Sequence, residues 1–242
     1  MYASDIVHDV IIAIDGPAGA GKSTVARAVA ARLGFAFLDT GALYRCAVLA
    51  GLRREAPPEE IVGSLDIRLG DRILLDGDDV TEAIRAPEIS QLTPAAAARP
   101  ALREALTDKQ RTLMAHGDWV AEGRDIGTVV VPNAAVKVFL TASIQERARR
   151  RSGEHGLDLD AVRVALLARD QMDQEREHGP LHAAADAVEL DTTGIDTEAV
   201  VDAVLALVPD EYKNAPALFA VGPEGVSAPR KRRPRTLPQA AG

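Results

Sequence analysis

Val10–Thr24 reads VIIAIDGPAGAGKST and joins a β-rich apolar run to a glycine-rich turn and an alanine-rich segment. The turn follows the pattern G-x-x-x-x-G-K-[ST] from Gly16 to Ser23. Its glycines let the backbone approach a polyphosphate, and the first N–H groups of the next helix point at phosphate oxygens. The position of this turn between a predicted strand and a predicted helix favours a phosphate-binding loop over an ordinary strand-to-helix turn. The sequence therefore predicts binding of a nucleoside triphosphate.

Two side chains of this loop have an expected task. Lys22 reaches the β- and γ-phosphates as a point charge, and the hydroxyl of Ser23 is an oxygen ligand for Mg²⁺, the expected cofactor. The predicted ATP-binding residues cover the whole loop and the start of the helix: Gly16, Pro17, Ala18, Gly19, Ala20, Gly21, Lys22, Ser23 and Thr24.

Composition limits the class of protein. A chain of 242 residues with only 3% aromatic residues fits one α/β domain, whose core is built from Ala, Val, Leu and Ile. Cys46 is the only cysteine, which excludes an intramolecular disulfide and a zinc cluster and fits a reducing cytoplasm. No stretch approaches the ~20 apolar residues of a membrane span. We therefore expect a cytoplasmic protein that has no membrane partner.

Charge is distributed unevenly along the chain. The net charge is −8, and the five basic and no acidic residues of 227–242 leave −13 on the rest. An acidic surface binds nucleic acid poorly. Anionic substrates must therefore be bound by arginines that are placed locally. Pro, Gly and Ala dominate after Pro209, and we predict a disordered basic tail over residues 210–242.

Short apolar runs alternate with helical patterns, which predicts a parallel sheet covered by helices. The predicted strands are 10–14, 35–38, 119–121, 136–140 and 187–193. Residues 55–115 break this rhythm, because they contain a predicted hairpin over 67–75 and a series of prolines that punctuate the chain. We interpret them as an inserted subdomain of short strands and one helix, which begins at Ala101.

Polar side chains follow two of the predicted strands. Thr40, Tyr44 and Arg45 come after the second strand, and Arg124–Asp125 follows the third between two glycines. Ligands of open α/β sheets bind beyond the carboxyl ends of the strands, so these side chains are candidate ligand contacts. For Thr40 and Tyr44, a capped amphipathic helix without any ligand is an equally good explanation.

Further arginines lie on predicted helices. Arg103 lies in a first helical turn, where the dipole disfavours a cation; this indicates a nearby anion, although a solvated arginine is the simpler alternative. Arg169, Asp173 and Arg176 have the spacing of one helix face, which a surface ion-pair ladder would also explain. For most arginines of the run Glu146–Arg151, a solvated charged face is the favoured interpretation.

Several blocks of the sequence taken together resemble one family, the bacterial cytidylate kinases, which are P-loop nucleoside monophosphate (NMP) kinases. A lone phosphate-loop pattern would fit hundreds of families, but this combination is specific and runs in order from Val10 to Pro209. The blocks are IDGPAGAGKST, FLDTGALYR, LDGDDVTEAIR, EGRDIGTVVVP, KVFLTAS-x-x-ERARRR, RD-x-x-D-x-x-R and DAVELDTT.

The resemblance implies an α/β P-loop NTPase-type fold with three layers, a parallel sheet core, an inserted NMP-binding subdomain and a short lid. Residues 10–209 would form a single kinase domain followed by the tail at 210–242. Its parts would be a core (10–54, 116–150 and 182–209), an NMP-binding insert (55–115) and a lid (151–181).

The activity implied by the resemblance is ATP-dependent phosphorylation of CMP and dCMP to CDP and dCDP, an in-line transfer with Mg²⁺ in pyrimidine nucleotide metabolism. The partners would be ATP and CMP or dCMP, with no nucleic acid, and the protein would be a monomer. One alternative is a kinase for UMP, AMP or a metabolite hydroxyl; a hydroxyl acceptor needs a base, for which only Asp125 is a candidate. Another alternative, motivated by the basic tail, is a regulatory or nucleic-acid-binding P-loop protein.

The resemblance also assigns roles to residues. The catalytic residues would be Lys22, Arg124, Arg169 and Arg176. The CMP-binding residues would be Thr40, Tyr44, Arg45, Arg103, Arg124, Asp125, Arg169 and Asp173. The chain departs from the family in two places: its basic tail lies outside the family pattern, and where many members have a serine that reads the cytosine, it has Thr93-Pro94-Ala95. The contact to the base is therefore unassigned, and discrimination between CMP and UMP stays open.

Overall fold

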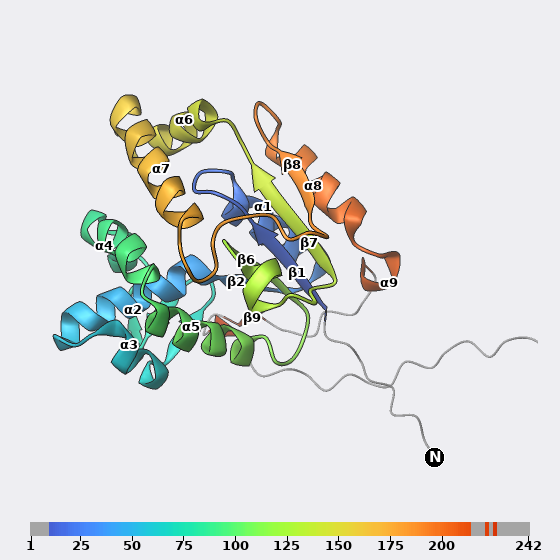
Figure 1. Cartoon of the computed structure of the whole chain (residues 1–242). Coiled ribbons are helices and arrows are strands. Elements are labelled where there is room, and N and C mark those ends of the chain that lie inside the picture. The colour runs from blue at the N-terminus through green and yellow to red at the C-terminus, as the bar shows by residue number, and fades with distance from the viewer. Residues whose placement is uncertain (1–9, 214–220, 223–224, 227–242) are drawn as a thin grey trace, which may run out of the picture.

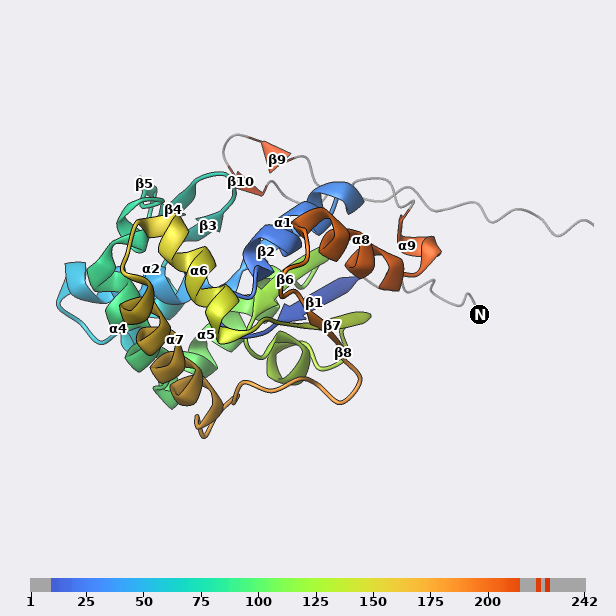
Figure 2. The same ribbon diagram turned by 90° about the horizontal axis from the view of Figure 1, so that it is seen from above.

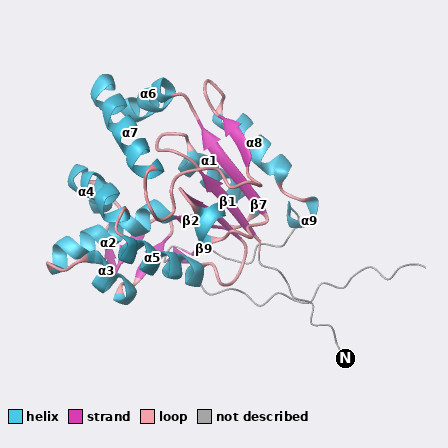
Figure 3. Ribbon diagram, in the orientation of Figure 1, coloured by secondary structure: helices cyan, strands magenta, loops and turns pink. Residues whose placement is uncertain are grey.

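A computed structural model describes residues 10–213, 221–222 and 225–226 of the chain. Its centre is a five-stranded sheet in the order β2-β6-β1-β7-β8, in which every pairing is parallel (Figures 1 and 3). The strands are β1 (Ile11–Asp15), β2 (Ala36–Asp39), β6 (Trp119–Gly123), β7 (Val136–Thr141) and β8 (Val188–Asp191). The glycine-rich loop follows β1, which is the middle strand. The loop therefore lies between the carboxyl ends of the neighbouring strands β6 and β7.

Helices cover both faces of the sheet, which confirms the three-layer prediction (Figure 2). Alternate side chains of β1 point to opposite faces: Ile12 and Ile14 pack with α1 (Lys22–Leu33) and α8 (Thr197–Leu207). Ala13 points to the other face, where α2 (Thr40–Arg54) and α5 (Pro100–Leu113) lie. Because both faces are buried, β1 reads as the continuous apolar run seen in the sequence.

The segment between α2 and β6 forms a separate group of short elements. It contains α3 (Pro58–Ile61), the 3₁₀ turns Val62–Ser64 and Ala83–Arg85, α4 (Pro87–Ala97), α5 and the antiparallel strands β3 (Ile67–Leu69), β4 (Ile73–Leu75) and β5 (Asp78–Asp79). The predicted hairpin is confirmed. The helix α4 was not predicted, because its prolines read as interruptions. Pro87 and Pro100 instead occupy first helical positions, where proline is favoured.

Two helices, α6 (Ile144–His155) and α7 (Leu159–Gln174), pack together beyond the end of β7. A buried guanidinium, that of Arg147, holds both to the glycine-rich loop: its Nη1 lies 2.6 Å from Asp170 Oδ2 and 3.3 Å from the Ala18 carbonyl oxygen. The helix α7 ends at Gln174, so the prediction of one helix face for Arg169, Asp173 and Arg176 is wrong for the last residue.

The stretch predicted as a tail contains regular structure where it is described. Asp210–Lys213 forms a helical turn, α9, and β9 (Val221–Gly222) pairs with β10 (Gly225–Val226), which contacts β3. The basic residues 230–235 lie outside the described residues. No helix in the described part of the chain is long and apolar enough to span a membrane.

Candidate active site at the carboxyl ends of the sheet

The loop between β1 and α1 is fixed by close backbone packing. Gly16 has a φ of +145°, and a Cβ there would lie 2.0 Å from the carbonyl oxygen of Leu140 in β7, so only glycine fits. Lys22 is the first residue of α1 and is buried, with its Nζ donating to the Pro17 carbonyl oxygen at 2.9 Å. The ammonium group therefore lies over the loop, beside the N–H groups that open α1, which is a phosphate-binding arrangement.

The electrostatic surroundings of Lys22 indicate an anionic ligand. The pKa of Lys22 is lowered from 10.5 to about 7, mainly by burial and secondly by the positive charge of Arg124. Glu122 raises this pKa but does not compensate for the burial. A nearby polyphosphate would supply the missing negative charge and restore the charged form of the lysine.

Two cavities meet at this loop. The central cavity opens beyond the sheet between the loop, α2, α4 and α7, and the α1 cavity lies between the loop, α6 and the start of α8. Both cavities are lined by Gly19, Lys22, Ser23 and Arg151. A group bound at Lys22 is therefore within reach of ligands in either cavity.

The central cavity collects the side chains that the sequence singled out for the second substrate. The residues brought together there are Thr40, Tyr44, Arg45, Arg103, Arg124, Asp125, Arg169, Asp173 and Arg176. They come from α2, α5, α7 and the segments after β6 and α7. Of the predicted ATP-binding residues, Gly19–Thr24 line the α1 cavity, whereas Gly16 and Pro17 line neither cavity and shape the loop instead.

Asp15 positions the segment that carries Arg124 and Asp125. The carboxylate of Asp15, at the end of β1, accepts the N–H groups of Ile126 at 2.9 Å and Gly127 at 2.8 Å. These residues begin η3, a single helical turn over Ile126–Val130. Burial raises the pKa of Asp15 from 3.8 to about 6, against the lowering effect of the two N–H groups.

Ion pairs connect the arginines across elements that are far apart in sequence. Arg124 Nε and Arg176 Nη2 donate to the two carboxylate oxygens of Asp173, at 2.9 and 2.8 Å. Arg103 and Asp125 form a buried pair, and the Arg103 guanidinium lies 6.0 Å from the centroid of the Tyr44 ring. The anion that the position of Arg103 indicated is therefore present in the protein as Asp125.

Arg169 is partly buried and lies near other cations. Its Nε has no hydrogen-bond partner among the described residues. Burial and the charge of Arg124 lower the pKa of Arg169 from 12.5 to about 9, and only Asp173 acts strongly in the opposite direction. Arg169 and Lys22 together give the inner end of the central cavity more positive than negative charge, which suits a phosphate.

Carboxylates beside Ser23 offer ligands for a magnesium ion. Glu122, at the end of β6, is buried and its Oε1 has no hydrogen-bond partner. Burial and the neighbouring Asp39 raise the pKa of Glu122, and its carboxylate interacts with the Ser23 hydroxyl. No group of three or more His, Cys, Asp or Glu side chains in the described ranges could hold a metal unaided. The residues therefore fit Mg²⁺ that takes its remaining ligands from phosphate oxygens and water.

Three sets of cavity residues were missed from the sequence. Asp39 and Glu122 end buried strands beside predicted site residues, which is a usable signal. Arg151 lines both cavities, although the charged run on α6 indicated a solvated face. On α4, Ser90 and Ala97 were hidden by the failure to predict this helix, whereas Thr93 and Pro94 had been named only as a departure from the family.

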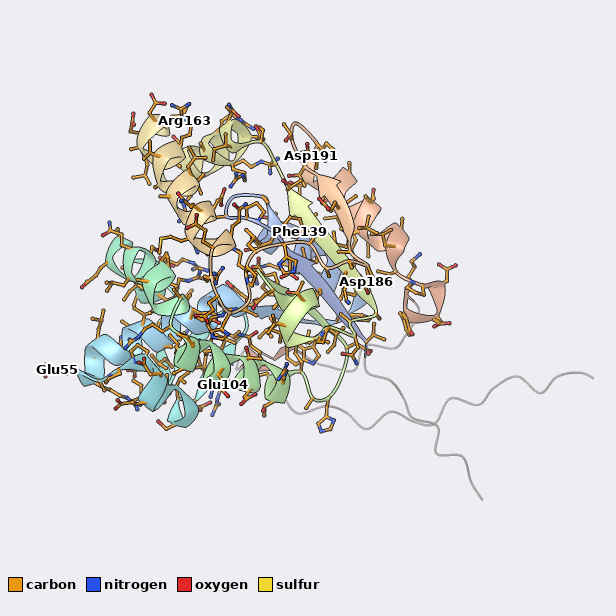
Figure 4. All side chains as sticks on the ribbon, viewed as in Figure 1. Glu55, Glu104, Phe139, Arg163, Asp186 and Asp191 are labelled. Atoms are coloured by element: carbon orange, nitrogen blue, oxygen red, sulfur yellow. The ribbon has the colours of Figure 1, made fainter. Side chains whose placement is uncertain are left out.

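Other charged residues point away from the cavities. In Figure 4, Arg163 lies on the outer side of α7 and Glu55 lies at the outer end of the insert. Neither lines a cavity, and 47% of the Arg163 side chain is exposed. Location on the same helix as Arg169 is thus not sufficient for a role in the site, and Arg163 is a matched control for it.

Comparisons with known proteins show the family to which this chain is similar. The profile of the family described as Cytidylate kinase matches residues 12–210. A cytidylate kinase of Desulfitobacterium hafniense (strain Y51) is 48% identical over 84% of this chain and 94% of its own length. A cytidylate kinase of Carboxydothermus hydrogenoformans is 46% identical over 81% of this chain and 96% of its own length.

Among solved structures, an uncharacterized protein from Eubacterium ventriosum ATCC 27560 has a TM-score of 0.51 to this chain. The match covers 82% of this chain and 97% of that protein, with 11% sequence identity. At this level of identity the match shows a shared fold alone.

Proposed function

The chain belongs to the cytidylate kinase family and phosphorylates CMP and dCMP with ATP, and we propose that the transfer takes place at Lys22. The observation that carries this proposal is the meeting of the two cavities, which share Gly19, Lys22, Ser23 and Arg151. Two nucleotides in separate cavities would then have their phosphates in contact beside the same lysine, as an in-line transfer requires.

ATP occupies the α1 cavity in this proposal. Its phosphates lie along the loop, where the N–H groups at the start of α1 bind them and the positive end of the helix dipole attracts them. Its base lies toward α6 and the turn before α8. The residues that line that part of the cavity include Arg149, Arg150, Thr192, Ile195 and Asp196.

CMP or dCMP occupies the central cavity. Its phosphate lies at the cationic inner end near Lys22, Arg124 and Arg169, and the nucleoside lies toward Tyr44 and α4. Asp173 holds Arg124 and Arg176 in place through its two oxygens, so it organises the phosphate-binding arginines as well as lining the cavity.

During transfer the protein supplies charge and position. Lys22, Arg124 and Arg169 neutralise the oxygens of the phosphoryl group as it leaves ADP, and Arg151 adds a fourth cation between the cavities. The acceptor is a phosphate that is already largely ionised near neutral pH, so no general base is needed. Asp125 is occupied by its pair with Arg103 and is not assigned that task.

Mg²⁺ is the cofactor that we propose for this reaction. When bound, it would neutralise part of the negative charge of the ATP phosphates. Ser23 would hold the ion directly, while the carboxylates of Glu122 and Asp39 would bind its shell of water. Closure of the predicted lid, residues 151–181, would exclude water from this site and so suppress hydrolysis of ATP.

From the family resemblance we propose that the protein is a monomer in the cytoplasm. It would act in pyrimidine nucleotide metabolism without a nucleic-acid or membrane partner. Sedimentation velocity of the purified chain tests the oligomeric state. A single species near the chain mass of 25.6 kDa is expected, and a stable dimer would contradict this part of the proposal.

A compound that spans both cavities tests the placement of the nucleotides. Adenosine and cytidine joined by a 5′,5′-pentaphosphate should compete with ATP and with CMP alike, and should bind more tightly than either. The Lys22→Ala variant should bind it much more weakly, because its phosphates pass that lysine. Competition against ATP alone, with CMP still able to bind, would contradict the proposed arrangement.

A further inference from the structure

The glycine-rich loop is packed directly against the α6–α7 pair. The side chain of Ala18 is buried in an apolar cluster with Ala148 of α6 and Leu166 of α7. A Cβ on Gly19 would lie 3.0 Å from the Cβ of Arg147 in α6, so the helix approaches the loop at a residue that has no side chain. The loop and the two helices therefore form one packed unit.

A buried ion pair gives this packing a fixed direction. The Arg147 guanidinium donates to the carbonyl oxygens of Ala142 and Ala18, at 3.0 and 3.3 Å, and to Asp170 Oδ2 at 2.6 Å. The other carboxylate oxygen of Asp170 has no hydrogen-bond partner in the described part of the chain. Both side chains are buried, and neither residue lines the central or the α1 cavity. The pair thus joins α7 to the loop without being part of either cavity wall.

The place of Arg169 depends on this anchoring of α7. Arg169 precedes Asp170 directly and lines the central cavity, but its Nε has no hydrogen-bond partner among the described residues. Asp173, on the same helix, is held independently by Arg124 and Arg176. Residues of one helix keep fixed directions relative to one another, so the contact that fixes Asp170 also fixes Arg169.

We propose that Arg147 and Asp170 are positioning residues that hold Arg169 in place beside Lys22. The proposal rests on the role in phosphoryl transfer that is proposed above for Arg169. The pair keeps α7 at a fixed rotation and distance from the loop, so that the Arg169 guanidinium meets the phosphoryl group that the loop holds. A displacement of about 1 Å near a reacting group can cost roughly 10² in rate, so a pair outside the cavities can control turnover.

Asp170→Asn tests this proposal, because it removes the charge that orients Arg147 and nearly keeps the shape of the side chain. The kcat with CMP should fall by about tenfold or more, with the Kd for ATP within about twofold of wild type. In the Arg169→Ala background the same substitution should change kcat by less than about twofold, since the residue through which it acts is already absent. Asp160→Asn, which breaks the exposed pair with Arg163 on α7, is the matched control and keeps the wild-type kcat.

A second variant separates positioning from loss of folding. Replacing a buried ion pair by apolar side chains is often neutral or stabilising, so Arg147→Met combined with Asp170→Leu should keep a cooperative thermal transition. Its kcat should nevertheless fall by about tenfold or more, because apolar contacts do not fix the rotation of α7. A smaller fall in either folded variant, or an equal loss from Asp170→Asn with and without Arg169, overturns the proposal. Full turnover in Arg169→Ala alone would instead contradict the role proposed for Arg169.

Discussion

At the scale of single residues, the site is defined by cations that the protein alone does not neutralise. Lys22 is buried and Arg169 is partly buried, and the removal of each side chain from water lowers its pKa. Burying a charge without a partner is unfavourable, and such charges mark functional sites more often than they stabilise a fold. Binding of phosphate groups therefore removes an electrostatic cost that the free protein carries.

Lys22 should take up a proton when ATP binds. Its pKa is about 7 in the free protein, so at pH 8 it is mostly neutral, and the phosphates raise its pKa again. Binding at pH 8 should therefore be accompanied by uptake of up to about 0.9 proton, and by much less at pH 6, where the lysine is already charged. Isothermal titration calorimetry in buffers of different ionisation enthalpy measures this uptake.

The Lys22→Arg variant controls for other groups, since an arginine stays charged at pH 8. It should show little uptake at either pH. Equal uptake in wild type and in this variant would assign the proton to another residue and contradict the prediction for Lys22.

Arg169→Ala should lose most turnover while still binding ATP. The guanidinium lies in the central cavity and acts on the transferring phosphoryl group, a role that can contribute roughly 10³–10⁵ in rate. Steady-state kinetics should show a kcat lower by about 10³, with the Kd for ATP nearly unchanged. Arg163→Ala on the exposed side of α7 should keep wild-type kinetics. An unchanged kcat in Arg169→Ala would refute the role of this arginine.

Residue types and spacing predicted many of these side chains. They did not predict which arginines of the charged run on α6 face the protein and which face solvent. A solvated face was the expectation for most of these arginines. Arg149 is exposed, but Arg147 is buried against Asp170 and Arg151 lines both cavities. Consecutive residues of a helix point in different directions, so only the packing of α6 on α7 and on the loop decides which arginine faces inward.

At the scale of elements, Asp15 connects the middle strand to the turn that follows β6. Asp15→Asn should weaken this connection, because the N–H groups of Ile126 and Gly127 bond to different carboxylate oxygens, and the amide nitrogen that replaces one of these oxygens cannot accept. The turn also carries Arg124 and Asp125, so the KM for CMP should rise about tenfold, with a smaller change in the KM for ATP. Equal changes in both KM values would indicate a general loss of structure instead.

The same variant gives a pH test of stability. The pKa of Asp15 is higher in the folded protein (about 6) than its ordinary value of 3.8, so the folded state binds more protons between these values. Its contribution to the free energy of unfolding therefore falls as the pH rises from 4 to 6, by up to about 3 kcal/mol. Wild type should lose stability relative to Asp15→Asn across this range in urea denaturation. A constant difference would contradict the raised pKa.

Sequence patterns predicted the sheet strands well and the helical insert less well. Buried parallel strands are marked by apolar runs, as in β1 and β7, whatever surrounds them. The helix α4 was missed because prolines usually end helices, whereas here Pro87 begins one and Pro94 lies inside it. Contacts with α2 and α5 hold this helix, and such tertiary packing cannot be seen in local sequence.

At the scale of the whole molecule, the site lies where separate groups of elements meet. The sheet supplies the glycine-rich loop and the strand ends, the insert supplies α4 and α5, and the α6–α7 pair supplies the remaining cations. The type of fold, the phosphate loop and the chemical class of the acceptor site were all predictable from the order of the motifs. The ion pairs between Arg124 and Asp173 and between Arg103 and Asp125 were not, because each joins distant segments.

The most direct test of the account is ADP release with Mg-ATP and each of CMP, dCMP, UMP, AMP and GMP, beside a control without acceptor. Strong turnover is expected with CMP and dCMP, weak turnover with the other nucleotides and little in the control. Equal turnover with UMP would leave the transfer mechanism intact and contradict selection for cytosine. Release that no monophosphate raises above the control would contradict the kinase function itself.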